Sequence, residues 1–310
     1  MGALIAGILS VRWHRRLAQA SVKKEHGRDA HATGFLQFTQ RNNFATFPHM
    51  KQTPLLLFLL LCSIPALTTQ AAIKTEVIDY KDGDVALQGF LAYDDSKPTG
   101  APGVLVVHEW WGNNEYSRKR AEQLAGLGYV AFALDMYGKG VEAKTAEEAG
   151  KLATPFRTDR GLMRSRAMAG LKILQSQKNV DPKRITAIGY CFGGTTAIEL
   201  ARGGAELAGV VSFHGGLDFS NPDETKNIKG RLLICTGADD PMVTPDKVTI
   251  FEDQLRKGKV DYQINVYGGA VHAFTNPSAD GRISPAIKYN EKADKRSWEA
   301  MKAFFGELFK

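Results

Sequence analysis

A cysteine in a glycine-flanked turn is the first residue of this chain that could do chemistry. The segment Gly189-Tyr-Cys-Phe-Gly-Gly194 follows an apolar stretch at 184–189 and precedes a helical pattern at 193–202. Its spacing is that of G-x-S-x-G with cysteine in the serine position, a pattern that places a nucleophile on a tight strand-to-helix turn. The start of a helix favours a thiolate at Cys191, and the amide of Phe192 is placed to donate to an oxyanion. The alternative is a buried cysteine in a packing turn.

A thiol nucleophile needs a base, because a free thiol has a pKa of about 8.5 and is mostly protonated at neutral pH. After residue 72 the chain has three histidines: His108, His214 and His272. His272 lies in a loop after an expected strand at 262–267, where the last member of a nucleophile–acid–histidine triad falls in chain order. We therefore predict His272 as the base. His108 and His214 each end an expected strand, and we interpret them as pocket lining or structural hydrogen-bonding groups.

The acid that orients the histidine has two candidates, Asp239 and Asp240. Both follow the apolar strand that contains Cys235, and both lie between the cysteine and the histidine in sequence. A carboxylate in this place would hold the imidazole tautomer and stabilise its charged form. The spacing alone leaves either aspartate open, with a loop or helix-capping role for the other.

The elements that must position these residues alternate between apolar runs and helical patterns. This alternation predicts one α/β domain with a mostly parallel sheet covered by helices on both faces. We expect an antiparallel leading pair, further strands that run on to residue 267, and a helix at the C-terminus. The expected strands lie at 75–80, 85–93, 103–108, 129–134, 184–189, 207–213, 232–236 and 262–267, and the expected helices at 116–127, within a polar stretch that runs to about 178, at 193–202, between the last two strands, and at 289–309. No linker or separate cap domain is expected.

The N-terminal region divides into two segments with different compositions. Residues 1–49 carry seven Lys and Arg against two acids, whereas 50–72 begin with Met50-Lys51, continue with an apolar run and end in small residues. The second segment is typical of a secretory signal peptide, since its apolar run is too short to span a bilayer. We predict that 1–49 is an upstream extension, that 50–72 is the signal peptide, and that 73–310 is the folded domain. The protein would then be periplasmic or secreted.

Charge and composition exclude several classes of protein. The 310 residues are 44% hydrophobic and 24% charged, which is ordinary for a globular chain. The net charge of +7 comes mainly from residues 1–51, so 73–310 carry a net charge of only +1 and no nucleic-acid partner is expected. Cys235 is interpreted as a core residue rather than a disulfide partner of Cys191. No His or Cys cluster has metal-ligand spacing, so neither a metal nor an organic cofactor is expected.

Four segments together resemble the dienelactone hydrolase family over about residues 75–310. They are Val107-His-Glu-Trp-Trp-Gly112, Gly189-Tyr-Cys-Phe-Gly-Gly194, Gly237-Ala-Asp-Asp-Pro-Met-Val243 and Gly269-Ala-Val-His-Ala-Phe274. The resemblance implies an α/β-hydrolase fold with a Cys-His-Asp triad, and it selects Asp240 over Asp239. It also implies that Glu109 contacts the resting thiol and that the Trp110 amide is the second oxyanion donor. The substrate pocket is expected to include Trp111, Tyr137, His214, Phe274 and Asn276.

One feature of the resembled family is missing. Its members that accept a carboxylated lactone have an arginine four residues after the catalytic histidine, where this chain has Asn276. A neutral amide cannot replace a charge-assisted hydrogen bond of about 1.5–3 kcal/mol. Arg157 and Arg160 are candidates for a second family arginine.

The expected function is hydrolysis of a small ester or lactone, as in a carboxymethylenebutenolidase, through an acyl-enzyme on Cys191. One alternative is a general carboxylesterase or thioesterase that acts on uncharged acyl groups, and another is a noncatalytic or redox thiol protein on the same fold. After signal cleavage we expect no membrane association, and a monomer or weak homodimer.

Overall fold

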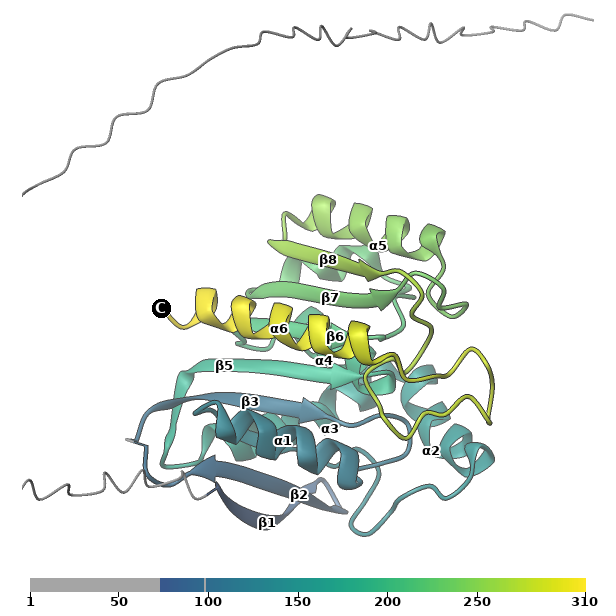
Figure 1. Ribbon diagram of the computed structural model, residues 1–310. Helices are drawn as coiled ribbons and strands as arrows, with labels where there is room; N and C mark the ends of the chain where they lie inside the picture. The colour runs from purple at the N-terminus through teal and green to yellow at the C-terminus, as the bar shows by residue number, and fades with distance from the viewer. Residues whose placement is uncertain (1–72, 98) are drawn as a thin grey trace, which may run out of the picture. The chain divides into compact units, whose positions relative to one another are not determined.

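The structure is a computed structural model that describes residues 73–97 and 99–310. In this part of the chain eight strands form one sheet in the order β1-β2-β4-β3-β5-β6-β7-β8 (Figure 1). The strands are β1 (Ile73–Asp82), β2 (Val85–Asp94), β3 (Ala101–Val107), β4 (Val130–Ala133), β5 (Val180–Tyr190), β6 (Gly209–Phe213), β7 (Arg231–Gly237) and β8 (Tyr262–Tyr267). The helices are α1 (Glu115–Gly126), α2 (Ala146–Thr158), α3 (Arg160–Gln175), α4 (Phe192–Arg202), the 3-10 helix η1 (Pro222–Asn227), α5 (Pro245–Gly258) and α6 (Glu291–Leu308).

One strand of this sheet, β2, runs opposite to the other seven. β1 pairs antiparallel with β2, and β2 pairs antiparallel with β4. All pairs from β4 to β8 are parallel. The antiparallel leading pair and the mostly parallel α/β sheet expected from the sequence are both confirmed. The predicted extension and signal peptide lie outside the described residues.

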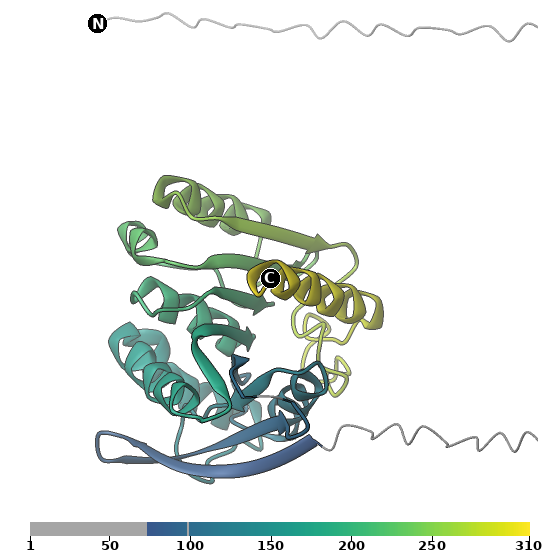
Figure 2. The same ribbon diagram turned by 90° about the vertical axis from the view of Figure 1, so that its left-hand side faces the viewer.

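Helices cover both faces of the sheet, as Figure 2 shows along its edge. Residues of α1 and α6 pack on one face in one hydrophobic cluster, and residues of α3, α4 and α5 pack on the other face in a second cluster. With both faces covered, every residue of β6 is buried. This double burial explains why the central strands read as continuous apolar runs instead of alternating patterns.

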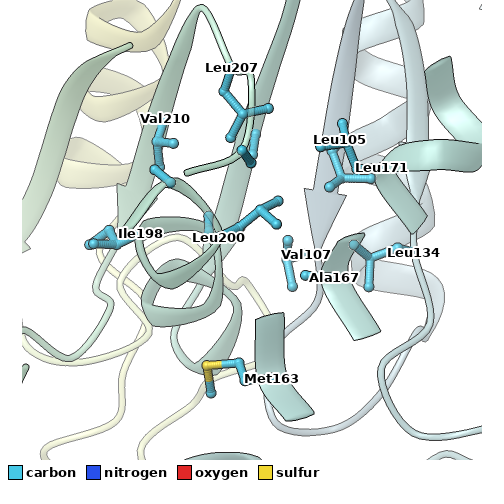
Figure 3. Close-up of a cluster of buried hydrophobic side chains, with 14 of the residues drawn as sticks. Leu105, Val107, Leu134, Met163, Ala167, Leu171, Ile198, Leu200, Leu207 and Val210 are labelled. Carbon is cyan, nitrogen blue, oxygen red and sulfur yellow. The ribbon is translucent and has the colours of Figure 1, made fainter. Parts of the chain in front are cut away.

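The second cluster joins the central strands to α3 and α4 (Figure 3). Leu105 of β3 and Leu171 of α3 are at most 1% exposed. Burial of each such side chain contributes about 1.5–3 kcal/mol to folding. The cluster thus anchors the strands from which the loops of the site emerge.

The polar stretch between β4 and α3 forms a helix of its own, α2, which was not resolved as a separate element from the sequence. Thr145 caps α2 by accepting a hydrogen bond from the Glu148 amide at 3.2 Å, and the Lys144 amide donates to the Glu148 side chain at 2.7 Å. This reciprocal arrangement stabilises the start of a helix. α2 brings Arg157 to the edge of the sheet where the strands end.

The carboxyl ends of the parallel strands meet at that same edge. Glu109 follows β3, Cys191 follows β5, His214 follows β6 and Asp240 follows β7. The long segment between β8 and α6 turns back over the edge: His272 forms a bridge with Ile287, and its amide donates to the Ala286 carbonyl at 3.0 Å. Ligands of open α/β sheets bind at this edge.

No helix among the described residues is both long and apolar enough to cross a membrane.

Candidate active site

Cys191 occupies a tight turn between β5 and α4. Its backbone angles are φ 53° and ψ −116°, in a region that residues other than glycine rarely adopt. A Cβ at Gly189 would lie 1.9 Å from the Gly193 carbonyl oxygen, and a Cβ at Gly193 would lie 2.2 Å from the Val107 carbonyl oxygen. Glycine is therefore required at both flanking positions, as the G-x-C-x-G pattern predicts.

The three residues of the expected triad lie in one chain of contacts. His272 Nε2 is 3.0 Å from Cys191 Sγ, and His272 Nδ1 is 2.8 Å from Asp240 Oδ2. Asp240 is itself held by the Met242 amide, which donates to Oδ1 at 2.8 Å. Asp240 is buried, whereas Asp239 is exposed. The structure thus places Asp240, and not Asp239, against the histidine.

His272 is 5% exposed, and its surroundings favour the imidazolium. Burial lowers its pKa, but Cys191 and Asp240 outweigh burial and raise the pKa to about 10. An imidazolium at 3.0 Å from sulfur stabilises a thiolate. The arrangement can therefore supply a charged sulfur nucleophile together with a proton donor beside it.

Two backbone amides near Cys191 have no protein acceptor among the described residues. The Phe192 amide belongs to the first turn of α4, whose N-cap, Cys191, makes no capping bond with its side chain. The Trp110 amide follows β3 and lies in the loop that leads to α1. Free N–H groups beside a nucleophile can stabilise an oxyanion.

The sequence profile of the dienelactone hydrolase family matches residues 87–309. The chain belongs to the dienelactone hydrolase family. It is accordingly a hydrolase that acts on ester or lactone bonds.

Individual relatives match nearly over their whole lengths. A protein of Aquifex aeolicus (strain VF5), provisionally named carboxymethylenebutenolidase, is 28% identical over 239 residues, 76% of this chain and 99% of that protein. The solved structure of m3DLH is 40% identical with a TM-score of 0.75, and the match covers 77% of this chain and all of that one. A dienelactone hydrolase-like promiscuous phosphotriesterase from metagenomic libraries is 38% identical with a TM-score of 0.74 over the same shares.

The buried Glu109 has a neutral partner, Asn276. Asn276 Nδ2 donates to Glu109 Oε2 at 2.6 Å, and both residues are buried. Burial raises the pKa of Glu109, although the Asn276 hydrogen bond and the charge of His272 oppose the shift. Within the described residues the Glu109 side chain bonds to Asn276, and its implied contact with the resting thiol is not among its hydrogen bonds.

A large and a small cavity meet at Cys191 and His272. The large cavity measures about 710 Å³ and the small one about 390 Å³, and Cys191, His272, Met242 and Arg157 line both. Glu109, Trp110, Trp111 and Asn276 line the large cavity, as expected. The small cavity adds Arg160, and neither Arg157 nor Arg160 forms a salt bridge in the described part of the chain.

Three residues expected in the pocket lie behind its wall instead. His214 and Phe274 are fully buried and line neither cavity. Tyr137 also lines neither, because its hydroxyl turns back to donate to the Trp110 carbonyl at 3.0 Å. Residues near strand ends, and in the loops that follow them, can point into the packed layers as well as into the cleft.

His214 makes structural hydrogen bonds, one of the two roles that the sequence predicted for it. The Cys191 amide is shared between the Phe213 carbonyl at 3.0 Å and His214 Nδ1 at 3.1 Å, and His214 Nε2 lies 2.7 Å from the Thr275 hydroxyl. Since Nδ1 accepts, Nε2 carries the proton and donates to Thr275. Burial and the nearby His272 lower the pKa of His214 well below its usual value, so the ring is neutral. It supports the strained backbone of the nucleophile.

Other residues of the site were missed at the sequence level. The segment between Asn276 and α6 contributes much of the wall of the large cavity: Pro277, Ser278, Ala279, Asp280, Gly281, Ile283 and Ile287. Its composition is that of an ordinary surface loop, and only its length could have indicated a functional segment.

Proposed function

We propose that the protein hydrolyses a small ester or lactone through a thioester on Cys191. The observation that carries the proposal is the continuous contact from Asp240 through His272 to Cys191 Sγ, at 2.8 and 3.0 Å. No metal or organic cofactor takes part in the proposed reaction.

In the first half-reaction the Cys191 thiolate attacks the substrate carbonyl carbon. The negative charge moves to the carbonyl oxygen, where the amides of Phe192 and Trp110 donate to it. The carbon–oxygen bond to the leaving group then breaks, and His272 gives its proton to the departing oxygen. The products are a thioester and an alcohol, or, from a lactone, a single thioester that retains the new hydroxyl.

In the second half-reaction neutral His272 takes a proton from water, and the hydroxide attacks the thioester. The carbon–sulfur bond breaks, the carboxylic acid leaves, and the thiolate–imidazolium pair is restored. Asp240 keeps the imidazole in one orientation and stabilises its charged form in both steps.

Two features of the site bear on the substrate. Arg157 and Arg160, in the small cavity, favour a substrate with a carboxylate, as in a carboxylated lactone, because guanidinium groups bind carboxylates in two-point hydrogen bonds. Asn276 favours the alternative, an uncharged ester, because it stands where family members that accept a carboxylated lactone have an arginine. We propose the carboxylated lactone, since Arg157 and Arg160 border the nucleophile and neither forms a salt bridge within the described residues.

The proposal is tested by hydrolysis of a carboxylated enol lactone and of short p-nitrophenyl esters. Cys191→Ala and His272→Ala should each lower kcat/KM by at least about a thousandfold, because neither partner works alone. Cys235→Ala is the matched control and should retain activity, because burial raises the pKa of that thiol to about 12 and Cys235 lines neither cavity. Full activity of Cys191→Ala or His272→Ala would refute the mechanism. A strong preference for uncharged esters would refute the proposal that the substrate is a carboxylated lactone.

We also propose that the protein is exported to the periplasm or secreted, on the strength of the signal-like segment at 50–72. N-terminal sequencing of the protein from the cell exterior or periplasm should find a start near residue 72. A chain that begins at residue 1 or 50 would contradict this.

A further inference from the structure

His108 is a fully buried histidine that the proposed mechanism does not use. It is the first residue after β3, is 0% exposed, and lines neither cavity. Its two ring nitrogens both have backbone partners: Nε2 is 3.2 Å from the Met136 amide nitrogen, and Nδ1 is 2.5 Å from the Glu109 carbonyl oxygen.

These partners determine the tautomer of His108. The Met136 amide can only donate, so Nε2 must be the acceptor, and the single proton of the neutral ring is on Nδ1. The Nδ1–H group therefore donates to the Glu109 carbonyl. An imidazolium would place a second N–H against the Met136 amide, and burial lowers the pKa of His108, so the ring stays neutral.

The carbonyl that His108 binds belongs to the peptide unit whose N–H is that of Trp110. The described residues contain no cis peptide bond, so this unit is trans and its C=O and N–H groups point in opposite directions. Fixing the carbonyl therefore fixes the direction of the Trp110 N–H. A hydrogen bond to the carbonyl also polarises the peptide and makes its N–H a stronger donor.

A hydrogen bond also holds the next peptide unit of the loop, which joins Trp110 to Trp111. The Tyr137 hydroxyl donates to the Trp110 carbonyl at 3.0 Å, and the Tyr137 and His108 rings pack edge to face with centroids 5.0 Å apart. Met136 and Tyr137 are neighbours in the segment after β4. This segment thus braces both peptide units that adjoin Trp110.

We propose that His108 is a positioning residue, which orients and polarises the Trp110 amide so that it can act as an oxyanion donor. The inference rests on the proposed function, because it requires an oxyanion to form beside Cys191. His108 touches neither substrate nor sulfur in this role, and acts only through the Glu109–Trp110 peptide.

The test compares His108→Leu, which removes the donor, with His108→Asn, whose amide nitrogen replaces Nδ1. Each variant is assayed on p-nitrophenyl acetate and on its thionoester, whose sulfur is a weak hydrogen-bond acceptor. His108→Leu should lower kcat for the oxygen ester about ten- to a hundredfold with little change in KM, since loss of a whole oxyanion donor costs about a hundred- to a thousandfold. The thionoester should lose much less, and His108→Asn should recover most of the oxygen-ester rate.

Two further variants separate this role from a structural one. Tyr137→Phe removes one hydroxyl and should lower the ratio of oxygen-ester to thionoester rates in the same direction, even if His108→Leu does not fold. Leu134→Met, a change in the nearby core, should leave the ratio unchanged. An unchanged ratio in Tyr137→Phe and, where it folds, in His108→Leu would overturn this inference alone, whereas an inactive wild-type protein would overturn the proposed function with it.

Discussion

Three histidines lie at the catalytic edge of the sheet, and only one of them is placed to carry a charge. His272 contacts a thiol and a carboxylate, which favour its protonated form. His108 and His214 each accept a hydrogen bond from a backbone amide, which requires a neutral ring. A residue of one type thus takes two roles according to its partners, as proton donor and as neutral support.

The neutral state of His214 predicts a dependence of stability on pH. Its folded pKa is depressed far below the unfolded value of about 6.5, so below pH 6.5 the unfolded chain binds a proton that the folded chain does not. The free energy of unfolding should therefore fall as the pH drops below 6.5, by up to about 1.4 kcal/mol per pH unit from this one group.

The measurement is urea unfolding between pH 5 and 7 of the wild type and of His214→Asn. Asparagine retains an acceptor at the position of Nδ1 and tolerates the φ of 42° at this residue, but it does not titrate. In the variant the free energy of unfolding should fall less steeply as the pH drops. Part of the decrease should remain, because His108 is also buried and neutral. Identical slopes would mean that His214 is protonated in the fold.

At the scale of the elements, the turn between β5 and α4 is tightly constrained. The helix begins directly after Cys191, so the strand, the nucleophile and the first helical turn are crowded against the end of β3. The crowding explains the glycines at positions 189 and 193. No side chain caps the helix, so the Phe192 amide has no acceptor among the described residues.

Gly189→Ala should therefore abolish soluble folding, because the new methyl would lie 1.9 Å from a backbone oxygen that cannot move independently. The control is Gly150→Ala within α2, where no atom lies within 4 Å of the new methyl. The control should raise the free energy of unfolding by about 0.5–1 kcal/mol, because alanine has the higher helix propensity. Circular dichroism melting of both variants is the measurement, and a folded, active Gly189→Ala would contradict the crowding.

At the scale of the whole molecule, a buried ion pair joins segments that are distant in sequence. Arg120 of α1 binds Asp294 of α6 at 2.6 Å and donates to the Thr275 carbonyl at 2.8 Å. Thr275 in turn contacts His214. α1, α6 and the histidine loop are thus connected through one guanidinium.

Asp294→Ala should lower the free energy of unfolding by about 3 kcal/mol, because it leaves the Arg120 charge buried with only neutral partners. Lys295→Gln is the control, since the Lys295–Glu291 pair on the same helix is exposed and screened by solvent. Its removal should not change stability measurably. Equal stability of the two variants would show that the Arg120 charge is solvated in another way.

The sequence by itself determined the fold class, the antiparallel pairing of β1 with β2, and the choice of Cys191 and His272 as the nucleophile and base candidates. These depend on local features: apolar runs, helical periodicity and a glycine-flanked turn. Spacing alone left Asp239 and Asp240 open, and the family resemblance selected Asp240. The tertiary structure places Asp240 against His272.

The tertiary structure alone also decided what the residues around the triad do. The partners of His108, His214 and Tyr137 lie between 23 and 61 residues away, apart from one adjacent carbonyl. No periodicity or motif encodes such contacts, because they arise only when the ends of β3, β4, β5 and β6 meet at one edge of the sheet. For the same physical reason His214 and Tyr137 were expected on the pocket wall and were found behind it.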